Sequence, residues 1–235
     1  MSRAAGAPAV GSGVECPLCG WRGAEFGPMG RIPRPNAMCP GCRSLERHRA
    51  MYLYLRDETD VLTSRARLLH VAPEPALREV FERAPGLAYV TTDLEMPDVS
   101  LKMDLGEMLF RDDVFDLVIC SHVLEHVDDD IRAMREIGRV VRPDGFALIL
   151  VPIFTTPGGV TLEDPTITSP EDRERAFGQR DHVRKYGDDF PERGAAAGLD
   201  VTAVAYAQQL GQDATARFGL HPPETLFVCR PGQTA

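Results

Sequence analysis

The sequence predicts a doubly wound α/β fold, built on a mostly parallel sheet of seven strands, that follows a small N-terminal zinc ribbon. From Arg67 onward, short apolar runs alternate with helical segments, a pattern typical of a parallel sheet covered on both faces. Before Arg67, four of the six cysteines form two C-x-x-C pairs. A chain of 235 residues has room for one full-sized domain and one such module.

The four N-terminal cysteines predict a structural zinc site. Cys16-Pro-Leu-Cys19 and Cys39-Pro-Gly-Cys42 are separated by 19 residues, and two such knuckles complete a tetrahedron of sulfur ligands. A disulfide set and a redox motif are the alternatives. They fit less well, because the chain shows no secretion signal and the pairs have no surrounding βαβ pattern.

The order of these features predicts the domain organisation. We expect a disordered lead-in over residues 1–13, the zinc ribbon over 14–43, a connecting helix over 44–66 that Ser44 caps, and the α/β domain over 67–235. No run of 18 apolar residues is present, so we expect a cytoplasmic protein without a membrane partner. Residues 155–189, rich in Pro, Gly, Asp and Thr, predict a lid or binding insertion.

The strands of the α/β domain are expected where short apolar runs are bounded by turn residues. The clearest, Phe-Asp-Leu-Val-Ile-Cys-Ser, spans 115–121, and the most apolar run lies at 145–152. Helices are expected at 75–84, which starts with a proline, and at 128–141. The other strands are expected at 67–71, 88–92, 99–103, 200–207 and 225–230. A ligand of such a sheet lies beyond the carboxyl ends of its strands.

Charge is unevenly distributed along the chain. The total is −9, but residues 1–56 contain eight arginines and three glutamates, a net charge of +5, which leaves −14 on the other 179 residues. An acidic total opposes nucleic-acid binding, whereas the basic head keeps a polyanionic partner possible. The acidic body and the few aromatic residues beside the arginines mean that nucleic acid is not favoured.

Three arginines gather where the connecting helix begins. Cations at a helix N-terminus oppose the helix dipole, so Arg43, Arg47 and Arg49 point to an anionic substrate group that is held there. Arg43 and Arg47 are therefore substrate-binding candidates. Solvation or pairing with Glu46 is the alternative.

Two phrases in the second half of the chain resemble a known family. Val114-Phe-Asp-Leu-Val-Ile-Cys-Ser-His-Val-Leu-Glu-His-Val127, followed by Arg139-Val-Val-Arg-Pro-Asp-Gly145, is similar to the fourth strand and the next loop of class I S-adenosylmethionine-dependent methyltransferases. Residues 14–230 more specifically resemble bacterial zinc-ribbon methyltransferases of the type 11-like group. Those proteins carry a Cys-Pro-x-Cys head, a Ser-Leu-Glu-Arg-His-Arg helix and a Gly-Gln-x-Asp-His-Val-Arg segment. The resemblance implies a Rossmann-like domain, S-adenosylmethionine and structural zinc.

The resemblance also implies cofactor contacts at the ends of the first four strands. Asp93 closes the second strand, where the family holds the ribose hydroxyls, and Asp104 with the Leu105 amide would read the adenine edge. Each acid has an alternative, which is to cap the turn that follows it. The other implied cofactor contacts are His70, Ala72, Glu74, Leu94, Ser121 and His122.

The loop after the first strand departs from the family pattern. The family places an acid at the end of this strand and glycines in the loop, whereas this chain reads Leu68-Leu-His-Val-Ala-Pro-Glu-Pro75. His70 takes the acidic position, and Ala72 and Glu74 replace glycines. Two prolines still fix a tight turn, and Glu74 is a candidate to bind the positively charged amino end of the cofactor.

The histidines carry the catalytic hypothesis. A base is needed only for an acceptor that carries a proton, and His182 or His122 would serve, with Tyr186 placing the substrate. Arg184 is a further substrate-binding candidate. The alternative is that Asp181, His182 and Arg184 only hold the insertion in place.

The sequence His122-Val-Leu-Glu-His126 also fits the H-x-x-E-H motif of inverted zinc peptidases. That motif belongs inside a helix, whereas His122 directly follows a strand, so the methyltransferase is favoured.

Three kinds of function remain open from the sequence. The first is methylation of a small or carrier-linked metabolite with an anionic group, which we favour. The second is methylation of RNA, with the basic ribbon on the phosphates, and salt dependence separates it from the first. The third is a non-catalytic protein that binds cofactor or a partner. The acceptor atom and the oligomeric state are not predicted.

Overall fold

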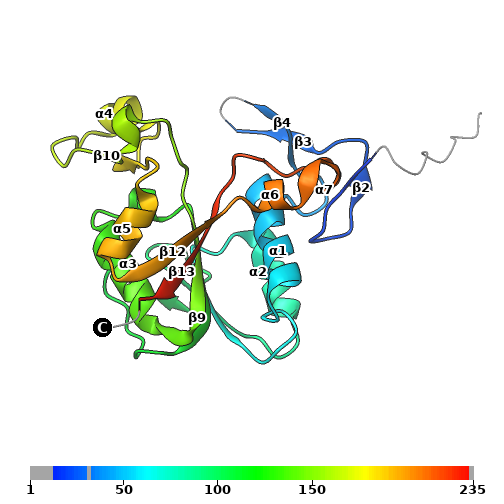
Figure 1. Ribbon diagram of the computed structural model, residues 1–235, viewed down its shortest axis with the longest axis horizontal. Coiled ribbons are helices and arrows are strands. Elements are labelled where there is room, and N and C mark those ends of the chain that lie inside the picture. Colours follow the sequence, from blue (N-terminus) through cyan, green and yellow to red (C-terminus); the bar gives the residue numbers. More distant parts are fainter. Residues whose placement is uncertain (1–12, 31–32, 233–235) are drawn as a thin grey trace, which may run out of the picture. The chain divides into compact units, whose positions relative to one another are not determined.

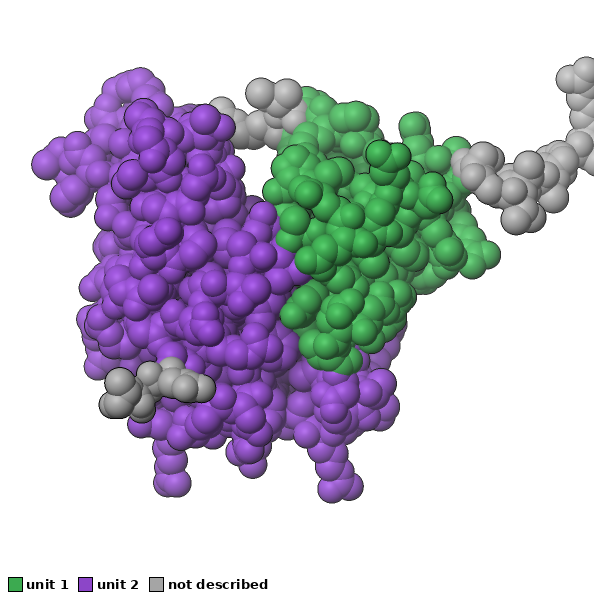
Figure 2. Space-filling view, in the orientation of Figure 1, with its two compact units in different colours: residues 1–59, 75–80, 205–224 green, residues 60–74, 81–204, 225–235 purple. Residues whose placement is uncertain are grey.

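The computed structural model describes residues 13–30 and 33–232 (Figure 1). The expected lead-in at 1–13 lies outside the described residues except for Gly13. The chain divides into two compact units, coloured in Figure 2. Unit 1 comprises residues 1–59, 75–80 and 205–224, and unit 2 comprises residues 60–74, 81–204 and 225–235. The predicted boundaries at 43 and 66 remain predictions.

Unit 2 contains the predicted seven-stranded sheet, with the strand order β12-β13-β9-β8-β5-β6-β7. Strands β5, β6, β7, β8 and β9 pair in parallel, and β13 pairs antiparallel with both β9 and β12. The mostly parallel, doubly wound fold is therefore confirmed. The strands are β5 (Arg67–Val71), β6 (Ala88–Asp93), β7 (Leu101–Lys102), β8 (Phe115–Ser121), β9 (Val141–Leu150), β12 (Leu199–Val204) and β13 (Leu226–Pro231).

The two central strands form where the sequence is apolar at nearly every position. In β8, five consecutive residues from Leu117 to Ser121 are buried, and in β5 four of the five residues are buried. Leu68 lies opposite Leu117 in parallel register, which fixes the alignment of the two strands. Burial of such side chains contributes about 1.5–3 kcal/mol each, so the centre of the sheet is the main source of stability in unit 2.

Three strands differ in extent from the predictions. Strand β9 begins at Val141, four residues earlier than expected, because Val141 already pairs with Phe115 of β8 before the register shifts and pairing resumes at Phe146 with Leu117. Gly145 permits this approach, since a Cβ there would lie 2.7 Å from the carbonyl oxygen of Asp116. Strand β7 is only two residues long, and the strand expected to reach residue 207 ends at Val204.

The helix α3 (Asp130–Val140) follows from capping and periodicity. The Asp129 side chain accepts a hydrogen bond from the Arg132 amide at 2.9 Å. Residues Ala133, Ile137 and Val140 are fully buried at helical spacing, so one face of α3 packs into the core of unit 2.

Residues 155–189 form short elements in place of another strand–helix unit. They are η2 (Pro157–Gly159), β10 (Leu162–Glu163), α4 (Pro170–Phe177) and β11 (Arg184–Lys185), followed by α5 (Phe190–Ala196). Strands β10 and β11 pair antiparallel with each other outside the main sheet. The break in the sequence pattern therefore corresponds to a separate two-stranded sheet with its own helix. We call residues 155–189 the insertion.

Unit 1 contains the cysteine-rich head and three helical segments. Two hairpins, β1 (Val14–Glu15) with β2 (Arg22–Gly23) and β3 (Gly27–Met29) with β4 (Arg34–Met38), precede α1 (Glu46–Glu58). Helices α6 (Tyr206–Gln209) and α7 (Gly211–Phe218) belong to the same unit, and α2 (Pro75–Arg83) crosses from unit 1 into unit 2. In the described part of the chain, no helix combines the length and apolarity needed to cross a membrane.

Arg49 holds unit 1 together. Its side chain is fully buried, and its guanidinium donates to the carbonyl oxygens of Ser44, Ala37, Phe218 and Gly219 at 2.7–3.0 Å. It also lies over the ring of Phe26, 4.0 Å from the centroid. An arginine suits this position because its five donors are fixed in one plane.

Candidate functional site

The four N-terminal cysteines converge on one point, as the spacing predicts. Their sulfur atoms all lie within 4.8 Å of one another, with Cys16 and Cys42 at 3.6 Å and Cys19 and Cys39 at 3.7 Å. Tetrahedral zinc with bonds of about 2.3 Å would place the sulfurs about 3.8 Å apart. The residues present therefore fit a structural zinc ion.

The surroundings of the sulfurs also suit a cation. The hydrogen bond with the Cys16 thiolate raises the pKa of the Cys42 thiol, and burial raises it further. A second thiolate is therefore unfavourable here unless a metal ion balances the charge. Ser44 does not cap the connecting helix as predicted. Helix α1 begins at Glu46 with Leu45 as its N-cap, and the Ser44 hydroxyl instead lies 3.3 Å from the sulfurs of Cys16 and Cys42.

A second group of polar residues lies along one edge of the main sheet. Strands β8, β5, β6 and β7 are adjacent and parallel, so their carboxyl ends meet at the same edge. Ser121 closes β8, Ala72 follows β5, Asp93 closes β6, and Asp104 lies two residues beyond β7. The topology thus collects at one edge the residues that were predicted to contact a cofactor.

The ends of the two central strands have unusual backbone conformations. Ala72 has a φ angle of +47° and His122 a φ angle of +54°, in the left-handed region that favours glycine. Ala72 adopts this conformation in the glycine-free loop, so the tight turn after β5 forms without glycine. Such strained residues cluster at ligand-binding sites.

Both predicted acids bind the turns that follow them through one oxygen. Asp93 Oδ1 accepts hydrogen bonds from the backbone amides of Glu95 and Met96 at 2.8 and 2.7 Å. Asp104 Oδ1 accepts a hydrogen bond from the Gly106 amide at 2.7 Å. In the described part of the chain, no hydrogen bond reaches Oδ2 of either residue. The turn-capping role therefore leaves one oxygen of each carboxylate for a ligand.

His70 points into the protein. Its imidazole is fully buried, with Nδ1 at 2.9 Å from the Tyr89 hydroxyl and Nε2 at 2.9 Å from Glu74 Oε2. His70 and Glu74 thus bind each other across the loop after β5. Among the other predicted cofactor contacts, Leu94 is 64% exposed and Leu105 is buried.

Ser121, His122 and Glu125 carry buried polar atoms at the carboxyl end of β8. Ser121 Oγ, His122 Nε2 and Glu125 Oε2 are buried without a hydrogen-bond partner in the described chain. His122 Nδ1 lies 3.3 Å from Glu125 Oε1. Buried polar groups normally have partners, so these atoms are candidates to bind a ligand.

His182 of the insertion reaches the same loop. It is buried, its ring lies perpendicular to that of His126 with centroids 4.7 Å apart, and its Nδ1 has no partner among the described residues. Burial lowers the pKa of His182 more than the nearby Glu125 carboxylate raises it, so the imidazole is neutral at neutral pH. A neutral imidazole can accept a proton or bind a metal ion.

The peptidase motif is not formed as a helical site. Glu125 and His126 belong to the short 3-10 helix η1 (Leu124–His126), and His122 precedes it with a positive φ angle. The two histidines of the motif therefore do not share an α-helical face.

Two residues that follow His182 bind the protein tightly. The buried Arg184 guanidinium donates to the carbonyl oxygens of Leu124 and Asp128 at 2.6 and 2.9 Å, and to Glu163 at 3.0 Å. The Tyr186 hydroxyl donates to Asp130 Oδ2 at 2.8 Å. Substrate roles for Arg184 and Tyr186 remain predictions, and the described contacts give both side chains a positioning role.

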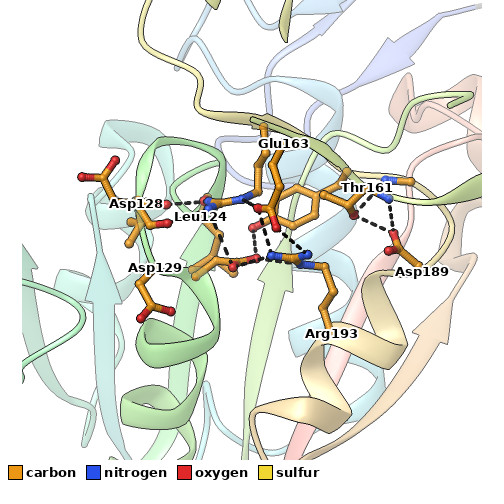
Figure 3. Close-up of polar contacts among 12 residues, drawn as sticks. Leu124, Asp128, Asp129, Thr161, Glu163, Asp189 and Arg193 are labelled. Atoms are coloured by element: carbon orange, nitrogen blue, oxygen red, sulfur yellow. Dashed lines mark hydrogen bonds and ion pairs between the residues drawn. The ribbon is translucent and has the colours of Figure 1, made fainter. Parts of the chain in front are cut away.

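A buried ion network completes the attachment of the insertion. Asp130 accepts two hydrogen bonds from Arg193 at 3.0 and 2.7 Å. Glu163 lies 3.2 Å from the same guanidinium (Figure 3). Asp189 accepts from the Thr161 amide and hydroxyl at 2.8 and 2.6 Å, as Figure 3 also shows. Sequence reasoning missed Asp130, Glu163 and Arg193, because no local pattern links residues so far apart.

The predicted substrate-binding arginines lie in unit 1. Arg43 is exposed and has a φ angle of +61°, and Arg47 is half-buried. Arg34 and Glu46 form a two-pronged ion pair at 3.2 Å, so Glu46 pairs with an arginine outside the predicted trio. The roles of Arg43 and Arg47 remain predictions.

Comparison with known protein families bears on this sheet edge. The family model described as a methyltransferase domain matches residues 83–149, from the end of α2 into β9. These residues are similar to a methyltransferase domain. The match contains β6, β7 and β8, whose carboxyl ends carry the candidate site. No curated protein matches the chain in sequence.

Solved structures are similar to this chain in fold. YcgJ from Bacillus subtilis is 15% identical, with 80% of this chain and 100% of that chain covered and a TM-score of 0.51. The 1,6-didemethyltoxoflavin-N1-methyltransferase from Burkholderia thailandensis, with S-adenosylhomocysteine bound, is 16% identical, covering 78% and 76% with a TM-score of 0.50. The [4+2]-cyclase SpnF is 17% identical, covering 95% and 88% with a TM-score of 0.50.

At these identities the likeness concerns the fold alone. The chain has the Rossmann-like fold of these structures and an N-terminal cluster of four cysteines, and its residues 83–149 match a methyltransferase domain. The cyclase has the same fold and is named for another reaction, so the substrate must be argued from the site.

Proposed function

We propose that the protein transfers a methyl group from S-adenosylmethionine to a small or carrier-linked acceptor with an anionic group. The observation that carries this proposal is the match of the methyltransferase-domain model to residues 83–149, which contain Asp93 and Ser121 at the ends of β6 and β8 and Asp104 just beyond β7. The S-adenosylhomocysteine bound to the Burkholderia thailandensis methyltransferase supports the choice of cofactor.

The residues at the sheet edge fit this cofactor. Oδ2 of Asp93 would accept hydrogen bonds from the ribose hydroxyls, while Oδ1 keeps the turn after β6 in place. Asp104 would accept from the adenine amino group through its own Oδ2. The Ser121 hydroxyl is buried without a partner in the described chain, so it would bind the methionine part.

When bound, the cofactor would supply a methyl group on a positively charged sulfur, for an acceptor atom that attacks the methyl carbon in line with S-adenosylhomocysteine as the leaving group. The chain's own residues align the acceptor and take its proton if it carries one. His122 and His182 are the candidates for that proton, because both have a buried ring nitrogen without a partner among the described residues. Tyr186, held by Asp130, fixes the segment that carries His182.

The charges of unit 1 support a small anionic acceptor over RNA. Arg22 pairs with Glu15, Arg34 with Glu46 and Arg56 with Asp57, and Arg49 is buried. Arginines that are already paired contribute little to a phosphate-binding surface. The exposed Arg43 is the best candidate to bind a single anionic group.

We also propose that Cys16, Cys19, Cys39 and Cys42 bind one structural zinc ion. Purified protein should contain zinc that is lost in Cys16→Ser together with the fold of unit 1. Zinc-free protein with an unchanged melting profile would contradict a structural role.

Calorimetric titration with S-adenosylhomocysteine tests the cofactor site. Asp93→Asn retains an oxygen for the Glu95 and Met96 amides but removes the charge that would face the ribose. Each charge-assisted hydrogen bond contributes about 1.5–3 kcal/mol, so affinity should fall about 10- to 150-fold. Asp213→Asn, at an exposed position in α7, is the matched control.

Three results would count against the proposal. If the wild-type protein does not bind S-adenosylhomocysteine, the cofactor site is wrong. If it binds but transfers no labelled methyl group to any small anionic acceptor or RNA, the non-catalytic function gains support. Transfer to RNA that weakens steeply with salt would favour the RNA substrate.

A further inference from the structure

We propose that Glu125, His126 and His182 bind a divalent transition-metal ion at the carboxyl end of β8. One carboxylate oxygen and one imidazole nitrogen from each histidine all lie within 4.8 Å of one another. Glu125 and His126 come from η1, and His182 comes from the insertion, 56 residues later in the sequence. This site is separate in the sequence and in its ligand chemistry from the four cysteines.

Two of the three side chains are buried with unused polar atoms. Glu125 is 1% exposed and its Oε2 has no hydrogen-bond partner among the described residues. His182 is 2% exposed, and the same holds for its Nδ1. A buried carboxylate needs a compensating charge or full hydrogen bonding, and a divalent cation between these groups supplies that charge.

The third ligand is oriented as metal-binding histidines usually are. His126 Nδ1 lies 3.2 Å from Asp181 Oδ2, which leaves Nε2 as the nitrogen for a metal ion. Histidine ligands commonly donate their other ring N–H to a carboxylate, which fixes the ring and its tautomer. Asp181 is thus a positioning residue for His126.

The backbone holds the two contributing segments together. The Val183 amide donates to the Glu125 carbonyl oxygen at 2.9 Å. This hydrogen bond joins the residue after His182 to the backbone of Glu125, so it links the two segments that provide the ligands. Arg184 binds the carbonyl oxygens of Leu124 and Val127 on either side of Glu125 and His126. The ligands are therefore preorganised by main-chain contacts that do not involve the metal.

The ligand set indicates which metal ions fit. One carboxylate and two imidazoles suit zinc, manganese, iron or cobalt in the divalent state, whereas four thiolates select zinc. Three protein ligands leave positions open for substrate or water. Manganese can therefore report on this site alone while zinc occupies the cysteines.

The role of the ion rests on the proposed function. An oxygen of the acceptor bound to the ion would have a lowered pKa and a fixed direction toward the methyl group. His182 would then be a ligand, and His122, whose Nδ1 lies 3.3 Å from Glu125, would be the remaining candidate to take the proton. The peptidase motif has a different ligand set, because His122 is not in this cluster.

Manganese titration of the zinc-loaded full chain, followed by electron paramagnetic resonance, tests the site. One manganese ion should bind per wild-type chain. Affinity should fall at least about 100-fold in His126→Ala and His182→Gln, and about 10- to 100-fold in Asp181→Asn. His221→Gln, at an exposed histidine in unit 1, is the matched control and should bind manganese like the wild type.

The outcomes separate this proposal from the cofactor site. Total metal analysis that finds one zinc ion and no bound manganese, cobalt or second zinc would overturn it, as would unchanged manganese affinity in both histidine variants. The His126 side chain is 34% exposed, so His126→Ala should fold even if variants of buried Glu125 do not. Titration of the same variants with S-adenosylhomocysteine reports separately on the cofactor.

Discussion

Replacement of Asp130 by asparagine tests whether the buried ion network holds the insertion in place. The Asp130 carboxylate accepts from Arg193 at 3.0 and 2.7 Å and from the Tyr186 hydroxyl at 2.8 Å, and lies 3.8 Å from Arg184. Asp130→Asn keeps the shape of the side chain and one oxygen, but leaves the buried guanidinium of Arg184 and the half-buried guanidinium of Arg193 facing a neutral amide.

The magnitude follows from the burial of this network. Asp130 is 2% exposed and the Arg184 side chain 3%, so water cannot replace the lost charge. Removal of one partner from a buried ion pair costs about 3–5 kcal/mol. A loss of this size is a large part of the roughly 5–15 kcal/mol that stabilises a typical domain.

Chemical denaturation at neutral pH measures the loss, and limited proteolysis shows where it acts. We expect a lower midpoint and faster cleavage within the insertion. Asp144→Asn, which removes an exposed partner of Arg142, is the matched control and should change little. A change below about 1 kcal/mol in Asp130→Asn would refute the proposed role of the network.

The same network predicts a pH dependence. Burial raises the pKa of Asp130, but the Arg193 hydrogen bonds and the Arg184 charge outweigh it, so the pKa lies below its ordinary 3.8. The stability that Asp130 contributes is therefore present above pH 3.8 and is lost as the pH falls through the lowered folded-state value. The difference between wild type and Asp130→Asn should shrink in that acidic range.

Substitutions at two further positions test other parts of the structure. Arg49→Lys keeps the charge but not the planar set of donors, so unfolding free energy should fall by about 2–4 kcal/mol in denaturation, with the exposed Arg56→Lys as control. Ala72→Gly should change stability by less than about 1 kcal/mol, because relief of the positive φ angle offsets the flexibility of glycine, whereas Ala72→Val should cost about 1–3 kcal/mol. Equal stability of the two Ala72 variants would contradict the strain assigned to that turn.

The centre of the sheet was predictable because burial alone fixes it. Strands 67–71 and 115–121 are found where the apolar runs predict them, since both are covered on two faces. The start of β9 was not predicted, because the exposed Arg142-Pro-Asp segment interrupts the apolar pattern. This segment lies where the register with β8 shifts, between the pair of Val141 with Phe115 and the pair of Phe146 with Leu117. The exposed edge strand β7 was overestimated for a similar reason.

In the candidate sites too, contacts between residues close in the sequence were predictable, and contacts between distant residues were not. The cysteine spacing was sufficient to predict the sulfur cluster, because each pair is a local turn. The meeting of Glu125 with His182, and of Asp130 with Arg193, depends on where the insertion folds. In the sequence, the polar residues within 181–186 were the one indication that the insertion takes part in a site. A buried acid in the first turn of a helix, such as Asp130, looks in sequence like an ordinary helix-start residue.

The way Arg49 closes unit 1 has a consequence for synthesis of the protein. Two of its four carbonyl partners are on Phe218 and Gly219, and the second of these lies 170 residues later in the chain. The cysteine-rich head leaves the ribosome first but cannot satisfy this buried cation until residue 219 has emerged. Early capture of zinc by the four thiols would keep the head in a compact form during that interval, and nascent chains made in zinc-poor cells should be the most exposed to degradation.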